Sequence, residues 1–418
     1  MRRFWIFNHY ATTPQTGPLL RHFYFAEYLK EKEIETTVFA ANELHQTGGT
    51  VDTQGASYLR TEEEGVPFVF VRTSKYQGNG LSRVRNMLSF FLGLLRISGK
   101  YAKQYGKPDV IMGSSAHPLT SIAGILIARR FHVPAIVEVR DLWPEAIFSV
   151  GKLKMESLPG RLLSAGEKWM YVHADAIVFT KEGDVDHIKE MGWDQEHGGK
   201  IDLGKCHYVN NGVNLSDFYA SIEHDILPDP NLTDESFRVT YTGTVRPVNN
   251  VGNLLDTAKL LKEHKDIRFL IFGGGSELET LKKRAADERI DNVVFKGFVE
   301  KKYIPYILSR SSVNVLNYSQ SNYNWSRGNS SNKLFEYMAS GKPLISTVRM
   351  GYSILDRYEC GLSLDECTSQ ALAREILKIH DMPEEAYAQM GQNAREGAKD
   401  FDFPVLTERL YQVIESVR

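Results

Sequence analysis

The stretch 329–343, NSSNKLFEYMASGKP, holds residues that could bind a charged ligand. Ser331 precedes a short run with helical spacing, and a glycine and a proline after the run are stop signals. The N-terminus of such a helix offers free N–H groups and a positive dipole to an anion, and Lys333 adds a charge in the first turn. Glu336 lies one turn further, where a carboxylate can bind a pair of hydroxyls. The stretch predicts a ligand with a phosphate end and a sugar end. The alternative is an ordinary amphipathic helix with solvated charges.

The size and charge of the chain limit what surrounds this helix. A chain of 418 residues is expected to form two domains of about 200 residues each. The net charge of −2 gives no case for nucleic-acid binding. Cys206, Cys360 and Cys367 lack zinc-ligand spacing, so we expect a reducing compartment and no structural metal. The N-terminal MRRFWIFNHY predicts a first strand, not a signal peptide.

Buried strand-like runs alternate with helical runs along the whole chain, which is typical of α/β domains. The loose polar segment Ile222–Ser236 divides two such series and is expected to be the interdomain linker. We therefore predict two Rossmann-like, doubly wound domains facing each other across a cleft. Residues 1–205 would form the first domain and 206–401 the second, with a C-terminal helix, 402–418, packing back on the first; the family resemblance given below implies that the first is the acceptor side and the second binds the nucleotide sugar.

Two polar loops of the first domain follow predicted strands, at the sheet edge where such folds bind ligands. The first loop, 8–18, contains Thr16 and Gly17, and Gly17 would let backbone approach a phosphate or sugar. The second contains Arg140, Asp141 and Glu145 within RDLWPE. The alternatives are a plain βα turn and a salt-bridged loop.

The stretch 65–108 contains no Asp or Glu, and the apolar run 87–97 lies in its middle. That run is too short to span a bilayer, which takes about 20 residues. Basic residues on both sides suit a helix lying in an anionic membrane surface. The residues expected to face the membrane are Arg83, Arg85, Arg96 and Lys100. The alternative is a core helix with solvated basic ends.

The segment GGGSE follows a predicted strand, which raises the possibility of nicotinamide binding. Gly273 and Gly275 fit the first two glycines of a dinucleotide fingerprint, but Leu278 stands at the third position. A dehydrogenase is therefore not favoured. The glycines 273–275 are instead expected to let backbone approach a flat group such as a nucleobase.

Ordered motifs carry a resemblance over nearly the whole chain. They are VNNGVNLSDF at 209–218, YTGTV at 241–245, IFGGGSE at 271–277, KGFV at 296–299 and NKLFEYMASGKPLI at 332–345. Together they resemble the retaining glycosyltransferases of family 4, which have the GT-B fold. NHYATTPQTGP and RDLWPE are similar to a bacterial branch that includes N-acetylfucosaminyl transferases of surface-polysaccharide assembly.

The resemblance implies a UDP-sugar donor, held mainly by the second domain without a bound metal or other cofactor. Glu336 matches the second Glu of the family's E-x7-E motif, which holds the donor ribose. Phe298 and Val299 would line the base pocket together with the glycines, and Gly17 would approach the donor phosphates. The remaining expected donor contacts are Gly243, Gly274, Ser331, Asn332 and Leu334.

The sequence departs from the family pattern at two places. Gly328 stands where the first Glu of the motif would be, so Asn329 or backbone N–H groups would take its role. The basic pair expected soon after Gly243 is also absent from its usual positions. Arg246 and Lys333 are the expected substitutes at the diphosphate.

The resemblance implies a front-face displacement in which the leaving phosphate oxygen takes the acceptor's proton. Asp141 is expected near the acceptor hydroxyl, and His117 is expected to contact the donor sugar. The predicted reaction moves an N-acetylated hexosamine or deoxyhexosamine to a polyprenyl-diphosphate-linked acceptor, at the inner face of the cytoplasmic membrane. Two alternatives remain open: a UDP-sugar epimerase with the same fold, and a non-catalytic nucleotide-sugar-binding subunit.

Overall fold

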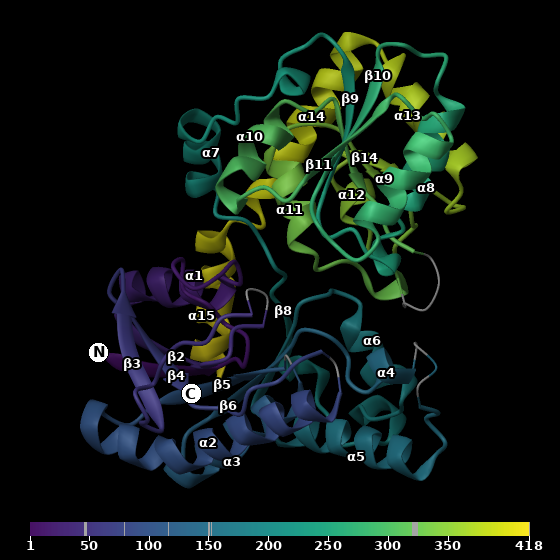
Figure 1. The fold of residues 1–418 in the computed structure, drawn as a ribbon. Coiled ribbons are helices and arrows are strands. Elements are labelled where there is room, and N and C mark those ends of the chain that lie inside the picture. The colour runs from purple at the N-terminus through teal and green to yellow at the C-terminus, as the bar shows by residue number, and fades with distance from the viewer. Residues whose placement is uncertain are drawn as a thin grey trace. The chain divides into compact units, whose positions relative to one another are not determined.

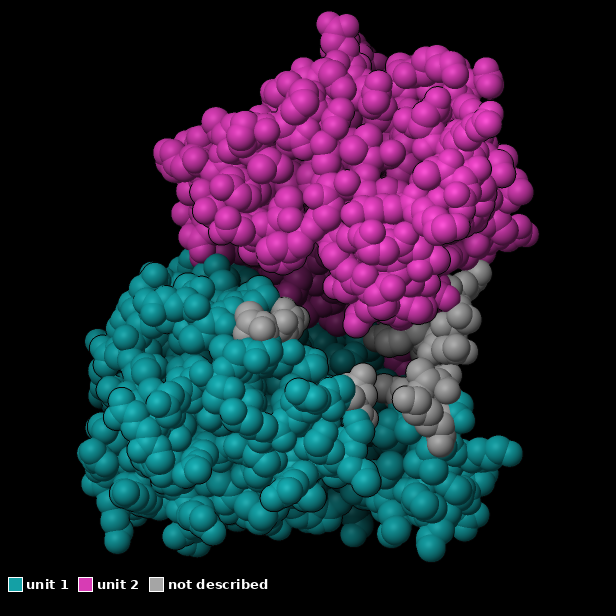
Figure 2. All heavy atoms as spheres, in the orientation of Figure 1, with its two compact units in different colours: residues 1–210, 403–418 teal, residues 211–402 magenta. Residues whose placement is uncertain are grey.

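The structure is a computed structural model that describes residues 1–45, 48–78, 80–115, 117–148, 151, 153–319 and 325–417. It divides into unit 1, residues 1–210 with 403–418, and unit 2, residues 211–402 (Figure 2). The boundary expected at 205/206 therefore lies at 210/211. The linker expected at Ile222–Ser236 lies inside unit 2, where Leu232 is fully buried against Leu270 and Phe272. The polar composition of the segment suggested an exposed linker. The structure instead packs the segment into unit 2 through the buried side chain of Leu232.

Unit 1 is built on one mixed sheet whose described strands run in the order β3-β4-β2-β1-β5-β6-β7-β8 (Figure 1). All neighbours pair in parallel except β3 and β4. The strands are β1 Arg2–Phe7, β2 Ile34–Ala41, β3 Tyr58–Glu63, β4 Val66–Val71, β5 Val110–Ser114, β6 Ala135–Val139, β7 Ala176–Phe179 and β8 Cys206–Tyr208. The helices are α1 Arg21–Leu29, α2 Leu81–Tyr105, α3 Pro118–Phe131, α4 Glu145–Phe148, α5 Leu158–His173, α6 Asp184–Glu190 and α15 Phe403–Ser416.

Alternation along β1 divides the core of unit 1 into two layers. Trp5 and Phe7 pack under α2, α3 and α5 on one face of the sheet. Phe4 and Ile6 pack under α1 and α15 on the other face. Successive side chains of a strand point to opposite faces, so a continuous apolar run serves a sheet covered on both sides.

The hairpin formed by β3 and β4 was not predicted from the sequence. Its first strand, YLRTEE, is polar, and Pro67 lies in the second. Both features argue against a central strand, but β3 is an edge strand where a polar outer side is tolerated. Glu64 and Gly65 form the turn with positive φ values of 51° and 70°. Such a Glu-Gly pair is weaker as a turn signal than Asn-Gly.

Unit 2 has a parallel sheet with the order β11-β10-β9-β12-β13-β14 among its described strands (Figure 1). The strands are β9 Phe237–Thr242, β10 Ile267–Phe272, β11 Val293–Gly297, β12 Val313–Leu316, β13 Leu344–Ser346 and β14 Gly361–Ser363. The helices are α7 Leu215–His224, α8 Gly252–Leu260, α9 Leu278–Asp287, α10 Ile304–Ser309, α11 Asn332–Ala339, α12 Ile354–Arg357, α13 Ser369–His380 and α14 Glu384–Lys399. Both units are thus doubly wound α/β units, which confirms the predicted fold class.

The last helix, α15, returns to unit 1. The ring of Phe403 lies 4.6 Å from that of Tyr24 and 5.8 Å from that of Phe25, both on α1. Arg2 of β1 forms an ion pair with Glu415 near the end of α15. These contacts place unit 2 as an insertion between β8 and α15 of unit 1.

Candidate functional site

The two strands at which the chain reverses its direction of winding in unit 2 are β9 and β12, and Lys333 lies at their carboxyl ends. The chain adds β10 and β11 on one side of β9 and then β12 to β14 on the other. Open α/β sheets bind ligands at such a switch point. Lys333, in the first turn of α11, places Nζ 5.0 Å from the ring centroids of both Tyr241 and Tyr318. The two rings hold the ammonium at this edge by cation–π attraction.

The charge of Lys333 is only partly offset, by the carboxylate of Glu336, whose charge acts to raise the pKa of Lys333. Within the described ranges, its ammonium forms no ion pair. Burial, together with the nearby positive charge of Arg246, lowers the pKa of Lys333 to about 8. Arg246 is itself exposed on the loop after β9. Two neighbouring cations at a sheet edge repel each other, and a bound anion offsets this repulsion. The pair is therefore suited to binding a diphosphate.

The glycine loops after β9 and β10 pack closely against each other. A Cβ at Gly273 would lie 1.8 Å from the carbonyl oxygen of Gly243, and one at Gly275 would lie 2.1 Å from that of Val245. Val245 N donates to Gly274 O at 2.8 Å, so the two loops are tied together. Gly273 and Gly275 are thus required for the packing of the two loops, and whether their backbone also faces a nucleobase stays a prediction. Gly274 alone among them has open space on its Cβ side.

Glu336 is not open in the structure. Its Oε1 contacts Nζ of Lys301, at the start of a 3₁₀ turn before α10. The Glu336 side chain is 13% exposed and that of Lys301 is 58% exposed. Lys301 was missed in the sequence, because nothing in its local pattern places it beside residue 336. A ligand hydroxyl pair that binds Glu336 shares or displaces this lysine.

The loop before α11 has a structural role for most of its described residues. Gly328 has a φ of 99°, a conformation that side chains rarely adopt. Asn329 is buried, and its Oδ1 accepts a hydrogen bond from Ser331 N at 2.8 Å. Ser331 is the N-cap residue, although its side chain makes no cap hydrogen bond, and Asn332 is exposed. The sequence predicts that the loop 323–331 sets donor specificity, and its first two residues, 323 and 324, lie outside the described residues.

Three further predicted donor contacts differ in how far their side chains are exposed. Leu334 is buried in the core with Phe335 and Met338, so its side chain is not available to a ligand. Phe298, directly after β11, is 81% exposed. Val299 is half-buried and packs beside Leu270 and Phe272. Of these two side chains, only that of Phe298 is exposed to a ligand.

In unit 1 the winding reverses between β1 and β5, and a histidine follows each strand. His117 Nε2 lies 2.8 Å from His9 Nδ1, and His9 Nε2 lies 2.7 Å from Oδ1 of Asn86 on α2. His117 is 1% exposed and caps α3. Burial and the charge of Arg83 lower the pKa of His117 to about 3. His117 is therefore a neutral imidazole at the ligand edge, and its partner His9 was not singled out in the sequence.

The loop after β1 is closed on itself by hydrogen bonds. Thr12 N donates to Leu19 O at 3.3 Å, and Leu19 N donates to Thr12 Oγ1 at 2.8 Å. Thr16 Oγ1 accepts from Thr13 N at 2.9 Å, so this hydroxyl is used within the turn. A Cβ at Gly17 would lie 3.0 Å from Cγ2 of Thr12, so glycine fits here with little room. Whether Gly17 meets donor phosphates stays a prediction.

The residues after β6 point in different directions. The Asp141 side chain is 58% exposed, with Oδ1 3.9 Å from Nζ of Lys181. Arg140 donates its backbone N–H to Ser115 Oγ at 3.2 Å. Glu145 Oε2 lies 3.8 Å from Nδ1 of His187. Asp141 is thus accessible near a buried lysine, whereas Glu145 belongs to a polar cluster with α6.

Below this edge, Glu138 of β6 is fully buried. Its carboxylate accepts from Arg21 Nε at 2.9 Å, from His22 Nε2 at 2.8 Å and from Ser114 Oγ at 2.5 Å. Burial by itself would raise the pKa of Glu138, but the charge of Arg21 outweighs it and holds the pKa well below the ordinary value. The cluster fixes the ends of β5 and β6, which carry His117 and Asp141.

Helix α2 has two distinct faces. Phe90, Leu94 and Ile97 pack in the core. The outer face carries exposed apolar residues and exposed basic residues, which are Leu81, Val84, Leu88 and Leu92, and Arg85, Arg96, Lys100 and Lys103. We call these eight residues the outer face of α2. No helix within the described ranges is long and apolar enough to cross a bilayer.

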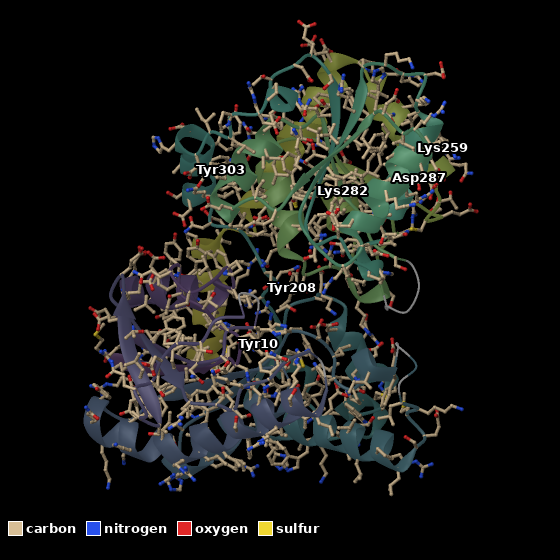
Figure 3. All side chains as sticks on the ribbon, viewed as in Figure 1. Tyr10, Tyr208, Lys259, Lys282, Asp287 and Tyr303 are labelled. Carbon is tan, nitrogen blue, oxygen red and sulfur yellow. The ribbon has the colours of Figure 1, made fainter. Side chains whose placement is uncertain are left out.

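Arg83 does not belong to the outer face of α2, contrary to the prediction. Its Nε and one terminal nitrogen donate to the Tyr10 hydroxyl at 3.1 and 3.0 Å, and Tyr10 is labelled in Figure 3. Helical spacing places residue 83 on the same side as the buried Phe90, seven positions on. The prediction placed Arg83 with its basic neighbours because of its charge alone. Its position on the helix instead directs its side chain toward the ligand edge.

Two family comparisons match the two halves of the chain. Residues 21–198 match the family described as "Glycosyl transferase 4-like domain". Residues 224–397 match the family described as "Glycosyl transferases group 1". Each half of the chain thus matches a family of glycosyltransferase domains, and the two α/β units have the GT-B fold.

Relatives and solved structures agree with this class. EpsD of Bacillus subtilis (strain 168), named as a glycosyltransferase, is 26% identical over 56% of this chain and 59% of its own. TuaH of the same organism, named as a glycosyltransferase of teichuronic acid biosynthesis, is 27% identical over 51% of this chain and 50% of its own. The chain thus spans little more than half the length of these relatives. The structure of Anabaena HepE in complex with UDP aligns over 100% of both chains, with a TM-score of 0.68 and 13% identity, and supports the fold.

Proposed function

We propose that this protein transfers a sugar from a UDP-sugar, with retention, to a polyprenyl-diphosphate-linked acceptor during assembly of a bacterial surface polysaccharide. The observation that carries the proposal is Lys333, whose ammonium has no ion-pair partner among the described residues and lies near the charge of Arg246 at the switch point of unit 2. The solved complexes of HepE with UDP and with UDP-glucose support a UDP-sugar donor. The name of TuaH, which refers to teichuronic acid biosynthesis, supports a place in polysaccharide synthesis.

The chemistry proposed is a front-face displacement. The bond from the anomeric carbon to the diphosphate oxygen breaks, and the acceptor oxygen forms a new bond to that carbon on the same face. The leaving phosphate oxygen takes the acceptor's proton. Lys333 and Arg246 stabilise the charge that develops on the diphosphate, which is the largest contribution such a site makes. Asp141 is assigned to the acceptor hydroxyl and His117 to the sugar.

The donor is proposed to carry an N-acetylated hexosamine or deoxyhexosamine, as the N-terminal motifs suggest. Glu336 is assigned to the donor ribose and Phe298 to the base. The outer face of α2 is proposed to lie on the inner surface of the cytoplasmic membrane, where its basic residues meet anionic lipid and its leucines enter the headgroup region. This position would bring the protein to a lipid-linked acceptor.

A UDP-release assay tests the proposal with a panel of UDP-sugars and a lipid-linked monosaccharide acceptor. We expect acceptor-dependent release with at least one UDP-hexosamine. If none of the UDP-sugars in the panel releases UDP, the transferase assignment is contradicted. Incubation with UDP-N-acetylglucosamine alone separates the epimerase alternative, which would give a new epimer without acceptor.

The role of Glu336 has its own matched control. Glu336→Ala should abolish turnover with the fold intact, since the ribose loses its carboxylate partner. Glu300→Ala removes an exposed carboxylate next to Lys301, on a side chain that is 64% exposed, and should leave turnover unchanged. Equal activity of the two variants would remove Glu336 from the donor site.

A further inference from the structure

The loops that follow β2 and β4 in unit 1 form the walls of a cavity of about 900 Å³. The two strands are parallel neighbours, so both loops lie at one edge of the sheet, where folds of this kind bind ligands. The volume is within the range of ligand pockets, about 300–1,000 Å³. Its lining includes Glu43, His45, Thr50, Lys75, Tyr76 and Ser82. We call this hollow the loop cavity.

Hydrogen bonds hold the walls of the loop cavity in place. Asn42, which is buried, donates its backbone N–H to Val71 O at 3.0 Å, and its side-chain Oδ1 accepts from Thr73 N at 2.8 Å. These bonds tie the loop after β2 to the loop after β4. Within the first loop, Thr50 Oγ1 donates to Glu43 Oε2 at 3.0 Å. The cavity is therefore shaped before any ligand binds.

Three stacked rings lie at the loop cavity. The ring of Tyr10 lies 4.6 Å from that of His45 at an angle of 26°, and the ring of His45 lies 6.1 Å from that of Tyr76 at 19°. His45 Nδ1 and the Tyr76 hydroxyl are 2.6 Å apart, which fixes these two rings against each other. The guanidinium of Arg83 lies 5.6 Å from the ring of Tyr10. The column thus presents a rigid aromatic surface, of which His45 and Tyr76 line the cavity.

The chemistry of this lining suits a neutral sugar. A sugar ring has a face of C–H groups that packs on an aromatic ring, and hydroxyls at its edge that a few polar groups can orient. Lys75 balances the charge of Glu43, and burial together with the charge of Arg83 lowers the pKa of His45, so that its ring is neutral. A phosphate, by contrast, would lie against the carboxylate of Glu43.

The loop cavity is too far from Asp141 to hold the same sugar. It follows β2 and β4, whereas Asp141 follows β6, and β1 and β5 lie between β2 and β6. Three strand spacings of about 4.8 Å separate the two positions by roughly 14 Å. One sugar ring does not span this distance. The cavity therefore suits a part of the acceptor that is further from the reacting hydroxyl.

The first turn of α2 joins the loop cavity to the outer face of α2. Ser82 lines the cavity, and its neighbours Leu81 and Val84 are 88% and 49% exposed. In a lipid-linked acceptor, the sugar attached to the diphosphate is the one nearest the lipid. With the outer face of α2 on a membrane, that sugar reaches the cavity, and the next sugar extends toward Asp141.

We infer that the loop cavity binds the sugar attached to the lipid diphosphate, so that the acceptor carries at least two sugars. The rings of His45 and Tyr76 pack against this sugar, and Glu43 accepts hydrogen bonds from its hydroxyls. The order of the two sugars rests on the proposed function, whereas sugar binding in the cavity is a property of the protein without donor.

Proton NMR of the whole protein tests the cavity without donor or acceptor. The probes are the methyl glycosides of glucose, galactose and N-acetylglucosamine, with sodium pyrophosphate as the anionic comparison. We expect at least one glycoside to shift the ring protons of His45, with UDP present or absent. Tyr76→Ala should lose this shift, and Tyr76→Phe, which keeps the ring, should retain it. Tyr411→Ala, which replaces a partly buried tyrosine of α15, is the matched control and should also retain it. If no glycoside shifts His45, or if pyrophosphate alone does, the inference is overturned.

Kinetics test the length of the acceptor and separate this inference from the proposed function. A polyprenyl-diphosphate-linked disaccharide is compared with the corresponding monosaccharide. We expect a KM about tenfold lower for the disaccharide, and Tyr76→Ala should remove most of this difference while it changes the KM for the UDP-sugar much less. Equal KM values in the wild type would overturn the two-sugar acceptor. If no UDP-sugar releases UDP with either acceptor, the transferase proposal fails while the result with the glycosides stands.

Discussion

Arg21 and Glu138 form an ion pair at 2.9 Å in the interior of unit 1, with side chains 5% and 0% exposed. Arg21 also donates to the backbone carbonyls of Val209, at 2.8 Å, and Asn210. These are the last residues of unit 1 before the chain enters unit 2. One guanidinium therefore joins α1, β6 and the point where the chain leaves the first sheet.

Glu138→Gln should destabilise the protein by about 3–5 kcal/mol, because it leaves the buried charge of Arg21 without its partner. Denaturant unfolding measures the change. Glu62→Gln removes an ion pair at 3.2 Å in which the glutamate is 52% exposed, and should cost no more than about 1 kcal/mol. Equal losses in the two variants would show that burial adds nothing to the pair.

The KM for the UDP-sugar should rise between pH 7 and pH 9, because the pKa of Lys333 is lowered to about 8. Below that value the ammonium is charged and binds diphosphate. Above it the amine is neutral and the attraction is lost. Lys333→Arg keeps the charge across this range and should flatten the profile, although its geometry differs. A rise of the same size in Lys333→Arg would assign the titration to another group.

Gly273→Ala should destabilise the protein by at least about 1–3 kcal/mol, since φ is 141° and the new Cβ would lie 1.8 Å from Gly243 O. Gly274→Ala is the matched control, because no atom lies within 4 Å of its Cβ position. Thermal unfolding of both variants measures the difference. If Gly274→Ala keeps its stability but loses donor affinity, the open space beside Gly274 is where the ligand lies; similar melting temperatures for both would contradict the loop packing.

Binding to vesicles of anionic lipid at low salt should fall when Arg85, Arg96 and Lys100 are replaced together by Ser. The expected loss is about 1 kcal/mol for each charge. The control replaces three exposed lysines of unit 2, Lys259, Lys282 and Lys283, two of which are labelled in Figure 3. Sedimentation measures both. Unchanged binding of the α2 variant, or an equal loss in the control, would contradict the proposal that the outer face of α2 binds the membrane.

The alternation of strands and helices could be predicted from the sequence because buried parallel strands are continuous apolar runs. WIF in β1 and FLIF in β10 have this property, and their helices have regular spacing. The polar edge strand β3 could not be recognised, since its pattern depends on being at the edge. The place of Lys333 in the first turn of a helix after a loop could also be predicted, whereas its role at a diphosphate stays a prediction.

Contacts between distant residues were beyond the sequence. His9 and His117 are 108 positions apart, and Lys301 and Glu336 are 35 apart. Only the rule that adjacent parallel strands end at one edge brings the first pair together, and it needs the strand order. Arg83 is a further example. Its place in a basic stretch predicts an exposed side chain, but its contact with the Tyr10 hydroxyl depends on the packing of α2.

The two chain crossings of unit 2 lie side by side. Val213 pairs with Asp402, Val213 N donates to Phe401 O at 3.0 Å, and Leu215 N donates to Asp402 Oδ1 at 3.1 Å. Unit 2 therefore enters and leaves at one place, like a cassette with adjacent ends. A gene that exchanges the segment between codons 211 and 402 would keep every strand of the first sheet and its closing helix α15. Recombination between relatives would thus replace unit 2 as a whole and retain unit 1 with its two histidines, so that a new second unit is joined to an old first unit in one step.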